Sequence, residues 1–529
     1  MPKLLLALMA SVAAINMYGA ASEQARLLVS IVVDGLDSDY LDLLRDRFGN
    51  GGFRRLEREG VALRADYGTY LDATAATAEI STGAAPSVNG IGGTETYDRK
   101  TLRPTHVYAD GSALGNFTST AFAPRSLRVS TLSDETRIAS GGTNLSYTVA
   151  PNPGMAIGLA GHTANCALWP DPTTGNWASS TFYEEMPVAV AARNRAIPLT
   201  ARLDTMSWTP SLRPEDYPAL PDHLSHYPFR YVFPRGNAER LDMFLASPLL
   251  NREITALATD ILRNNKLGTR KGVTDVLNLG FTLQPFDYGK STDKRVEMMD
   301  AYIKLDRNLE QIFAEIDKNA GVGNSMIVLT ATPPRNQRRR DEERWGIPTG
   351  EFSTRKAISL LNVYLMALHG NGDYVSGCHG GNIYLNHDLI KERKLDIDSL
   401  RSEAAAFLAQ MTGIDRVYTV GDIITGHAGR NAEALRRNTV KATAGDIVFE
   451  PTPGFEVVDD YNIGNPAKAH TGMVHIGATA TAPVYIIAPG VAASRIATPV
   501  DARSIAPTVA RLLRIRSPNG AATAPLQLQ

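Results

Sequence analysis

Along most of the chain, short runs of consecutive aliphatic residues alternate with segments in which apolar residues recur at helical spacing. Segments 38–48, 253–264 and 296–316 place apolar residues three to four positions apart, as amphipathic helices do. Short continuous runs of aliphatic and β-branched residues predict buried strands at 26–33, 156–160, 276–281, 326–330 and 484–488. Strands that alternate with helices predict an α/β fold: a doubly wound, mostly parallel central sheet with helices on both faces.

Two stretches interrupt this alternation. Residues 199–242 are rich in Pro, Tyr and His and show little periodicity. Residues 357–446 contain a helical pattern of their own at 397–411, together with short strand-like runs. We expect both stretches to be cap insertions in one large domain that covers residues 22–529.

The N-terminus carries the pattern of an export signal. A Lys at position 3 precedes an apolar run over 4–15, and small residues follow at 19–21. A run of about a dozen apolar residues is too short to span a bilayer, and no other stretch is long enough. We therefore expect residues 1–21 to be a cleaved signal peptide and the mature protein to be periplasmic, without a transmembrane segment.

Charge and cysteine content exclude several classes of protein. The 54 Lys and Arg residues balance 55 Asp and Glu residues, for a net charge of −1. A nucleic-acid-binding protein would need a marked basic excess, so nucleic acid is excluded as a partner. The two cysteines, Cys166 and Cys378, are too few for a disulfide framework or a four-thiolate metal site. Whether they form one bridge is open.

The first predicted strand ends at Asp34, a carboxylate at the edge where open α/β sheets bind ligands. Several ordered segments resemble the alkaline phosphatase superfamily, and specifically the secreted, PafA-like bacterial phosphatases related to nucleotide pyrophosphatase/phosphodiesterases. These segments are Val-Val-Asp-Gly at 32–35, Ile-Ser-Thr-Gly at 80–83, Pro at 86, Asn-Gly-Ile at 89–91, Ala-Gly-His-Thr at 160–163, Trp at 169, 175–183, Leu-Asp at 305–306, Leu-Thr-Ala at 329–331, 347–352, 381–386, 445–447 and 505–513. The resemblance implies a doubly wound sheet with caps, two zinc ions held by Asp and His, a Thr or Ser nucleophile, and Asn, Lys and Arg side chains on the phosphate.

The catalytic positions that the resemblance implies are substituted here. The nucleophile position falls on Ala73, whose methyl group cannot attack phosphorus, with Thr74 next to it. The phosphate-binding Asn position falls on Thr94, and the two cationic positions fall on Asn152 and Gly154. A neutral residue cannot offset the equatorial charge of a transferring phosphoryl group.

The implied metal ligands are substituted as well. Asp34 matches the first ligand, whereas the other five positions fall on Pro285, Gly289, Thr332, Pro333 and Gly472. Zinc is held by thiolate, imidazole and carboxylate groups, so one remaining carboxylate cannot hold two ions tightly. Asp287, His470 and His475 lie near these positions and are the side chains that could substitute for lost ligands. Asp287 with Lys290 is otherwise a surface ion pair.

These substitutions favour an exported, catalytically inactive pseudoenzyme that acts as a binding or scaffold component of the bacterial envelope. Its expected partner is an envelope protein, a glycan or a lipid, and no cofactor is expected. One alternative is a metal-dependent phosphomonoesterase or phosphodiesterase with a relocated site at Thr74, Asp34, Asp287 and His470, which would use zinc. Another is a small-ligand-binding protein that keeps the former cleft.

Some candidate residues have an ordinary structural interpretation beside the functional one. Thr74 and Thr77 suit a helix start or packing positions, His162 suits a structural turn, and Asp34 suits a hydrogen-bonding role at a strand end. An arginine-rich stretch, 335–344, follows the strand that should present the Asp-His pair. Its candidate binding residues, Arg338, Arg339 and Arg340, can engage carboxylates or phosphates, although a solvated loop is the other interpretation.

Overall fold

The computed structural model describes residues 24–528 apart from 184–185, 219–227, 290–293, 335–345, 347, 430–431, 462–469 and 473–479. The predicted signal peptide and Arg338, Arg339, Arg340, Lys290 and His475 lie outside the described residues. Among the described helices, none is long and apolar enough to cross a membrane.

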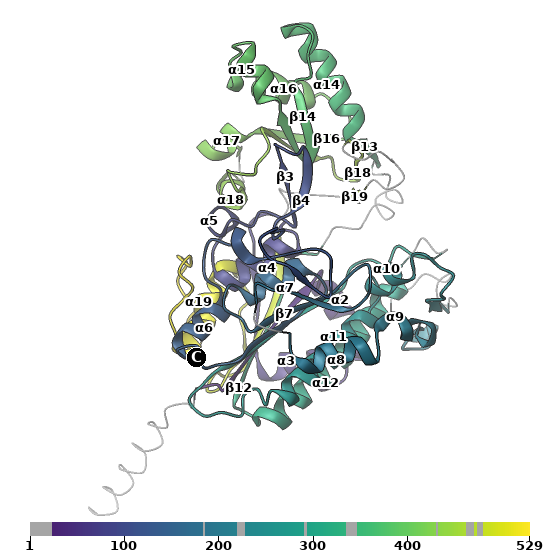
Figure 1. Cartoon of the computed structure of the whole chain (residues 1–529), viewed down its shortest axis with the longest axis vertical. Coiled ribbons are helices and arrows are strands. Elements are labelled where there is room, and N and C mark those ends of the chain that lie inside the picture. Colours follow the sequence, from purple (N-terminus) through teal and green to yellow (C-terminus); the bar gives the residue numbers. More distant parts are fainter. Residues whose placement is uncertain are drawn as a thin grey trace, which may run out of the picture.

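A large central sheet organises the lower part of the molecule (Figure 1). Its strand order is β21-β2-β20-β12-β1-β11-β6-β7-β8-β5, with β22 paired to β2. The central strands β12, β1, β11, β6 and β7 run parallel, whereas β20, β8 and β5 pair antiparallel to their neighbours. The bounds are β1 Leu27–Asp34, β2 Val61–Asp66, β5 Gly115–Asn116, β6 Ser146–Val149, β7 Cys166–Pro170, β8 Trp177–Ser180, β11 Asp275–Thr282, β12 Ser325–Ala331, β20 Thr481–Ile487, β21 Ser494–Arg495 and β22 Val500–Asp501. The predicted α/β fold is confirmed.

Helices cover both faces of this sheet. One group packs together on one side: α4 Ala73–Thr82, α6 Leu132–Ala139, α7 Pro153–Ala160 and α19 Ile505–Leu513. The other side carries α2 Ser38–Leu44, α3 Phe53–Glu59, α11 Leu249–Asn264 and α12 Arg295–Ala320. Sheet and helices enclose a continuous apolar core in which β1 is buried along its whole length. This explains why its sequence is apolar without alternation.

One predicted strand is wrong. Residues 156–160 belong to helix α7, which follows β6. Asn152 caps this helix by accepting a hydrogen bond from the Met155 amide, Pro153 occupies its first turn, and Gly161 at φ +68° ends it. Residues 154–160 are all buried, so the helix has no polar face. A fully buried helix of this length cannot be told from a buried strand by periodicity.

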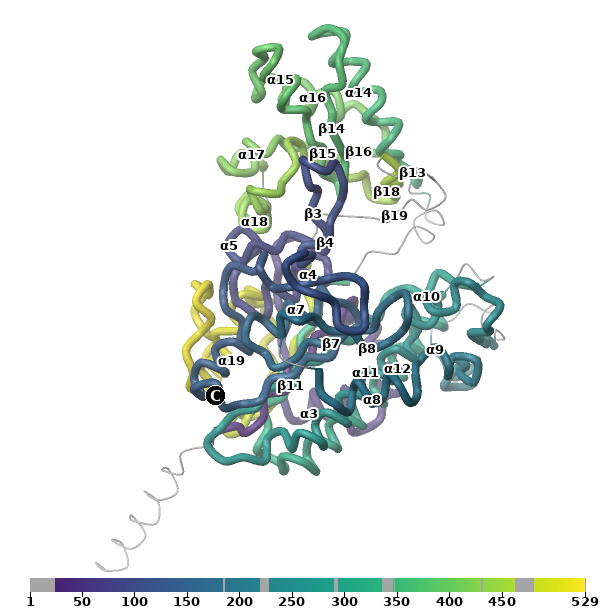
Figure 2. Tube along the Cα trace, viewed as in Figure 1, coloured from purple at the N-terminus to yellow at the C-terminus, as the bar shows by residue number. Residues whose placement is uncertain are grey.

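The predicted insertion 199–242 lies at the side of the core, next to α11 and α12 (Figure 2). Its described part consists of short elements, and Trp208 is buried there with its indole Nε1 donating to Asp300 of α12. The elements in and around it are α8 Val188–Ala196, α9 Leu199–Arg202, η3 Leu203–Thr205, β9 Ser207–Trp208, η4 Pro214–Asp216, β10 Tyr231–Val232 and α10 Arg240–Leu245.

The second predicted insertion, 357–446, falls within a separate cap at the top of the molecule in Figure 1. The cap has its own core around the sheets β14-β15-β17-β16 and β13-β18-β19. Its elements are β13 Gly350–Ser353, α14 Thr354–His369, β14 Val375–His379, β15 Asn382–Leu385, α15 His387–Glu392, α16 Ile397–Leu408, β16 Ile414–Thr419, α17 Val420–Thr425, α18 Ala432–Asn438, β17 Ile447–Pro451, β18 Phe455–Asp459 and β19 His470–Gly472.

A hairpin from the core reaches into this cap. Strands β3 (Glu95–Asp98) and β4 (Arg103–His106) project upward, and the Tyr97 hydroxyl donates to the Ser376 carbonyl at 2.7 Å. The Arg99 guanidinium pairs with the fully buried Asp446 at 2.9 Å. The hairpin therefore attaches the cap to the core.

The two cysteines are not bridged. Cys166 lies in β7 and Cys378 in β14, and both are buried free thiols.

Candidate functional site

The candidate site lies where three neighbouring parallel strands end. β1 pairs with β11 on one side and with β12 on the other, so Asp34 lies beside Thr282 and close to Ala331. Asp34 ends β1 and is only 8% exposed. Polar residues that follow β11 and β12 are therefore brought to its carboxylate.

The Asp34 carboxylate accepts hydrogen bonds from two neutral side chains. The Thr332 hydroxyl donates to Oδ1 at 2.6 Å, and the Gln284 side-chain amide donates to Oδ2. The Gly35 amide in turn donates to the Thr332 hydroxyl oxygen at 3.1 Å, which directs the hydroxyl proton toward Asp34. Thr332 occupies one of the positions where the family resemblance places a zinc ligand.

The start of α4, where the resemblance places the nucleophile, is occupied by a carboxylate. Asp72 caps the helix: its Oδ1 accepts from the Ala75 amide at 2.9 Å and its Oδ2 from the Thr94 amide at 2.6 Å. A negative side chain therefore occupies the end of the helix that would attract an anion. Ala73 follows Asp72 in the chain, and its side chain is a methyl group without a nucleophilic atom.

Thr74 does not cap the helix but packs beneath it. Its side chain is buried, and its hydroxyl forms a 2.8 Å hydrogen bond with the Thr94 hydroxyl. Thr77, also buried, lies one turn further along α4. Thr74 and Thr77 are therefore packing residues, as one of the two sequence interpretations has it, because Asp72 and not a threonine caps the helix.

The start of α7 meets the start of α4 at very short range. A Cβ added at Gly154 would lie 2.2 Å from the Thr74 hydroxyl oxygen and 3.2 Å from Asn152 Oδ1. The structure thus brings Thr94, Asn152 and Gly154, three positions where the resemblance implies phosphate-binding side chains, together around Thr74. The space that a side chain at 154 would need is taken by Thr74.

The loop after β11 carries the next predicted ligand positions. Pro285 is half-buried and Asp287 is exposed. Gly289 has φ +91°, a conformation that disfavours any side chain, and an added Cβ would lie 2.7 Å from a ring carbon of Tyr231. An imidazole at position 289 would need a different backbone.

The remaining predicted positions are only partly described. Pro333 is buried next to Thr332. His470 and Gly472 belong to β19, whose backbone pairs with β18, and the His470 side chain lies outside the described part of the structure. Asp34 and Asp287 are described, but the relocated site as a whole is therefore not defined.

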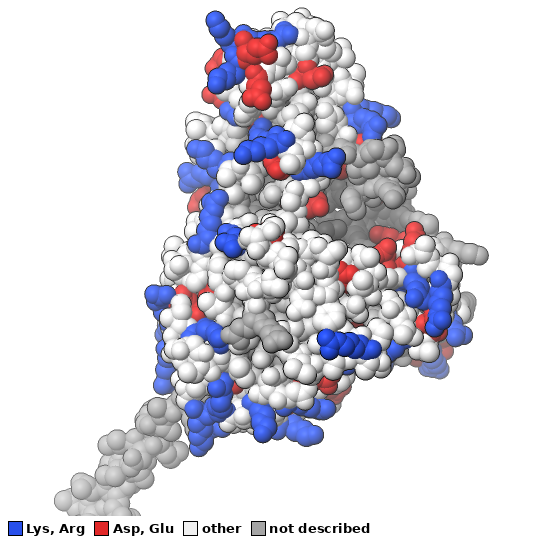
Figure 3. Space-filling model, viewed as in Figure 1, with Lys and Arg blue, Asp and Glu red and all other residues white. Residues whose placement is uncertain are grey.

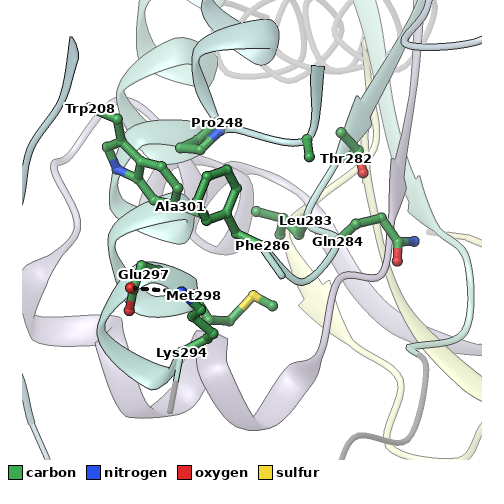
Figure 4. Close-up of a pocket in the computed structure, with 11 residues that line it drawn as sticks. Trp208, Pro248, Thr282, Leu283, Gln284, Phe286, Lys294, Glu297, Met298 and Ala301 are labelled. Atoms are coloured by element: carbon green, nitrogen blue, oxygen red, sulfur yellow. Dashed lines mark ion pairs between the residues drawn. The ribbon is translucent and has the colours of Figure 1, made fainter. Parts of the chain in front are cut away.

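Figure 4 shows a small pocket beside the β11 loop. It is lined by Gln284, Phe286, Trp208, Lys294 and Glu297 among others, and holds about 10 Å³. A space of this size holds about one water molecule. The loop next to Asp34 is thus packed against α12 and the first insertion.

Two histidines near these helices have defined roles. His162 follows α7 and contacts Asp134 through Nδ1 at 3.1 Å and the Leu127 carbonyl through Nε2 at 3.0 Å, and the hydrogen bond to Asp134 raises the pKa of His162. Burial lowers the pKa of His106 to about 4, so His106 is neutral at pH 7. His162 is thus a turn residue, as predicted, and His106 supplies no cation.

Zinc does not fit these residues. The donors on Asp34 present hydrogen atoms to its oxygens, whereas a bound zinc ion needs lone pairs from several side chains. Within the part of the chain that the structure describes, no group of three or more His, Cys, Asp and Glu residues could hold a metal ion. The positions after β11 and β12 carry Pro, Gly and Thr instead.

Sequence reasoning missed two residues of this site, Asp72 and Gln284. Asp72 had a readable signal, because an Asp before a helical run is a typical N-cap. Gln284 had none, since its contact with Asp34 joins residues 250 positions apart.

The sequence profile described as "Type I phosphodiesterase / nucleotide pyrophosphatase" matches residues 28–474. Alkaline phosphatase PafA of Elizabethkingia meningoseptica is 24% identical over 97% of this chain and 96% of its own length. Alkaline phosphatase PhoV of Synechococcus elongatus is 26% identical over 94% of this chain and 91% of its own length. A protein of Myroides odoratus named calcium-transporting ATPase is 25% identical over 96% of this chain and 94% of its own length.

Solved structures show the same fold. The crystal structure of wild-type PafA superposes with a TM-score of 0.82 at 22% identity and covers 96% of this chain and 99% of PafA. A PafA variant substituted at a Thr, an Asn, a Lys and an Arg gives a TM-score of 0.83 at 23% identity, with the same coverage. In that variant the Thr and Asn are separated along the chain as Ala73 and Thr94 are here, and the Lys and Arg as Asn152 and Gly154 are. The chain belongs to the type I phosphodiesterase/nucleotide pyrophosphatase family, in the alkaline phosphatase superfamily.

Proposed function

We propose that this chain is a non-catalytic member of its family, exported to the periplasm, that acts by binding a partner in the bacterial envelope. The hydrogen bonds on Asp34 are the observation that carries this proposal. The carboxylate at the first metal position accepts hydrogen bonds from two neutral side chains, Thr332 and Gln284. Two donors must be removed before that carboxylate can take up a metal in their place.

The phosphate side of the site supports the same proposal. Asp72 sets a negative charge at the start of α4, where a phosphate ester would need positive potential. Thr94, Asn152 and Gly154 supply no charge to offset that of a phosphate. A phosphate ester would therefore meet repulsion at this helix rather than attraction.

The relocated hydrolase is the less favoured function. Thr74 is buried and bonded to Thr94, so its hydroxyl does not face an incoming ester. Asp287 is exposed in its loop, and nothing in the described structure directs it toward Asp34. The export signal over 1–21 and the envelope protein, glycan or lipid partner remain proposals from the sequence.

Zinc loading and hydrolysis together test the proposal. The signal-cleaved protein is dialysed against zinc and then against buffer, and its metal content and its turnover of phosphate monoesters and diesters are measured. We expect little bound zinc, and the same background turnover in wild type, Thr74→Ala and Asp34→Asn. About two zinc ions per chain, with turnover that Thr74→Ala or Asp34→Asn abolishes, would refute the proposal.

A further inference from the structure

The central sheet has a second edge, opposite Asp34, where its parallel strands begin. β1, β11 and β12 start there in register, at Leu27, Asp275 and Ser325. Helices α6, α11, α12 and α19 run back from the Asp34 edge and end at this one. The strand starts, the helix ends and the loops between them therefore form one face of the core, which we call the basic edge.

Hydrogen bonds join these segments into a continuous surface. The Gln24 side-chain amide donates to the Leu513 carbonyl at the end of α19 at 3.1 Å and to the Thr274 hydroxyl before β11 at 3.4 Å. The Asn319 side-chain amide, near the end of α12, donates to the Leu267 carbonyl in the loop after α11 at 2.6 Å. Side chains from these segments are therefore held on one rigid surface.

Lys and Arg side chains are concentrated on the basic edge. Figure 3 shows them along the lower border of the core, with little acidic surface between them. A cation in the last turn of a helix offsets the helix dipole, which accounts for Arg263, Lys318 and Arg511. Arg270 and Lys271 lie in a loop, beyond the reach of a dipole. The exposed basic residues of this edge are Arg263, Lys266, Arg270, Lys271, Lys318, Arg511, Arg514 and Arg516.

The acidic side chains at or near the basic edge are each paired in the described structure. Glu135 is fully buried and pairs with Arg516 at 3.0 Å. The other pairs are Asp275 with Arg270, Glu315 with Arg263, Asp317 with Arg55, Asp260 with Arg193, Asp134 with His162, and Glu59 with Arg55 and Arg58. Lys266 and Lys271 form no ion pair with any described residue. The edge therefore keeps a positive excess that the protein itself does not neutralise.

Two exposed apolar side chains lie among these cations. Val322, 79% exposed, lies in the turn between α12 and β12, and Ile138, 56% exposed, lies near the end of α6. At a bilayer surface, basic side chains meet lipid phosphates while apolar side chains enter the boundary of the acyl region. A soluble polyanion would contact only the cations. The combination of both kinds of side chain therefore favours a bilayer.

The predicted export signal joins the described structure at the same edge. The Arg26 amide donates to the Asn324 carbonyl at 2.7 Å, in the turn that carries Val322. The predicted signal, 1–21, ends only a few positions before Arg26. While the signal is attached, the basic edge is thus the part of the described structure nearest to the membrane.

We propose that the basic edge docks on a bilayer of anionic phospholipid, with the lipid phosphates on its cations and with Val322 and Ile138 in the interface. This inference deepens the proposed function, because it names lipid as the envelope partner. Asp34 lies at the opposite edge of the sheet, so docking leaves the former reaction site turned away from the bilayer. Each basic side chain at an anionic surface strengthens binding about fivefold.

Flotation of the signal-cleaved protein with vesicles tests the proposal. Vesicles of phosphatidylglycerol and phosphatidylcholine in equal amounts are compared with vesicles of phosphatidylcholine alone. The wild type should float only with the anionic vesicles, and less as salt is added. Lys266→Gln/Lys271→Gln/Lys318→Gln should bind them about 100-fold more weakly. Val322→Ser should bind about fivefold more weakly, because it loses the apolar contact.

Matched variants control for net charge and for surface polarity. Lys100→Gln/Lys356→Gln/Lys391→Gln removes the same charge from exposed lysines of the hairpin and the cap. Val188→Ser changes a valine of α8 that is 83% exposed. Both should float as the wild type does, and all variants should keep the wild-type unfolding midpoint. A wild type that does not float, a basic-edge triple variant that floats unchanged, or a cap variant that loses as much binding overturns the proposal.

A soluble polyanion is the other possible occupant of a basic face. Heparin binding as tight as vesicle binding, together with flotation that is unchanged in Val322→Ser, would assign the face to a polyanion and overturn lipid docking. The zinc and turnover measurements report on the opposite edge of the sheet. A protein that floats but also binds zinc and hydrolyses esters would refute only the loss of catalysis, whereas a metal-free, inactive protein that does not float would refute only the docking.

Discussion

Glu79 is a buried acid in the middle of α4, and its replacement by Gln gives a sharp test of the structure. Its side chain is completely buried, and neither carboxyl oxygen has a hydrogen-bond partner among the described residues. The charged groups that face it from the neighbouring elements are Asp66, Arg437, Asp501 and Arg503. Burial outweighs the two arginines and raises the pKa of Glu79 to about 8 from an ordinary 4.5.

The size of the effect follows from the linkage between proton binding and folding. Between pH 4.5 and 8 the folded protein keeps a proton that the unfolded chain releases, so stability falls as pH rises. Each pH unit in this window costs about 1.4 kcal/mol. The loss is therefore on the order of 3 kcal/mol at pH 7 and on the order of 5 kcal/mol above pH 8.

Glu79→Gln keeps the shape of the side chain and cannot ionise. We expect the variant to match the wild type near pH 4.5 and to be more stable by about 3 kcal/mol at pH 7. Urea unfolding followed by tryptophan fluorescence at pH 5, 7 and 8.5 measures this difference. Glu392→Gln, at an exposed position of α15, is the control and should show no such trend. A stability difference that is independent of pH, or that shrinks as pH rises, would refute the reasoning.

Three further predictions concern the helix starts and the strand ends. Gly154→Ala should destabilise the protein by about 1–3 kcal/mol in urea unfolding, despite the helix propensity of Ala, because the new methyl meets the Thr74 hydroxyl. Thr74→Ala should remove much of this penalty in a double-mutant cycle, and additive effects of the two changes would contradict the close approach. Thr332→Val removes the hydroxyl that bonds the β1 carboxylate and should cost about 1–3 kcal/mol by the same measurement. An unchanged midpoint would show that this hydrogen bond is dispensable. The pKa of His162, followed by NMR, should lie above its ordinary value and fall in Asp134→Asn. The stability from this pair is present below the ordinary pKa of His162 while Asp134, whose own pKa is lowered, stays ionised, and it is lost as pH rises through the raised pKa of His162. A His162 pKa that does not respond to Asp134→Asn would exclude the contact.

Strands that cross the whole core were predictable from sequence, because a strand buried on both faces leaves a continuous apolar run. β1, β11, β12 and β20 lie where such runs predicted them. Helix α7 was not predictable in this way, since burial on all sides removes its helical periodicity. Its start did carry helix signals, an Asn followed by a Pro, and the apolar run obscured them.

The positions where the family resemblance implies catalytic groups could be named from the sequence, but the contacts that their residues make could not. That Ala73 cannot act as a nucleophile follows from its identity alone. The contact of Asp34 with Thr332 joins residues 298 positions apart, and depends on β11 and β12 flanking β1. Spacing along the chain contains no information about such a contact, which therefore needed the structure.

The close approach of α7 to α4 limits which side chains position 154 can accept. A side chain at position 154 is blocked while Thr74 keeps its hydroxyl in place. An arginine introduced there would have to follow a change at Thr74, and a change at Thr74 alone brings no cation to the site. Two changes in a fixed order are thus needed before a cation can stand at this position, so the packing of α7 against α4 disfavours a charged side chain there.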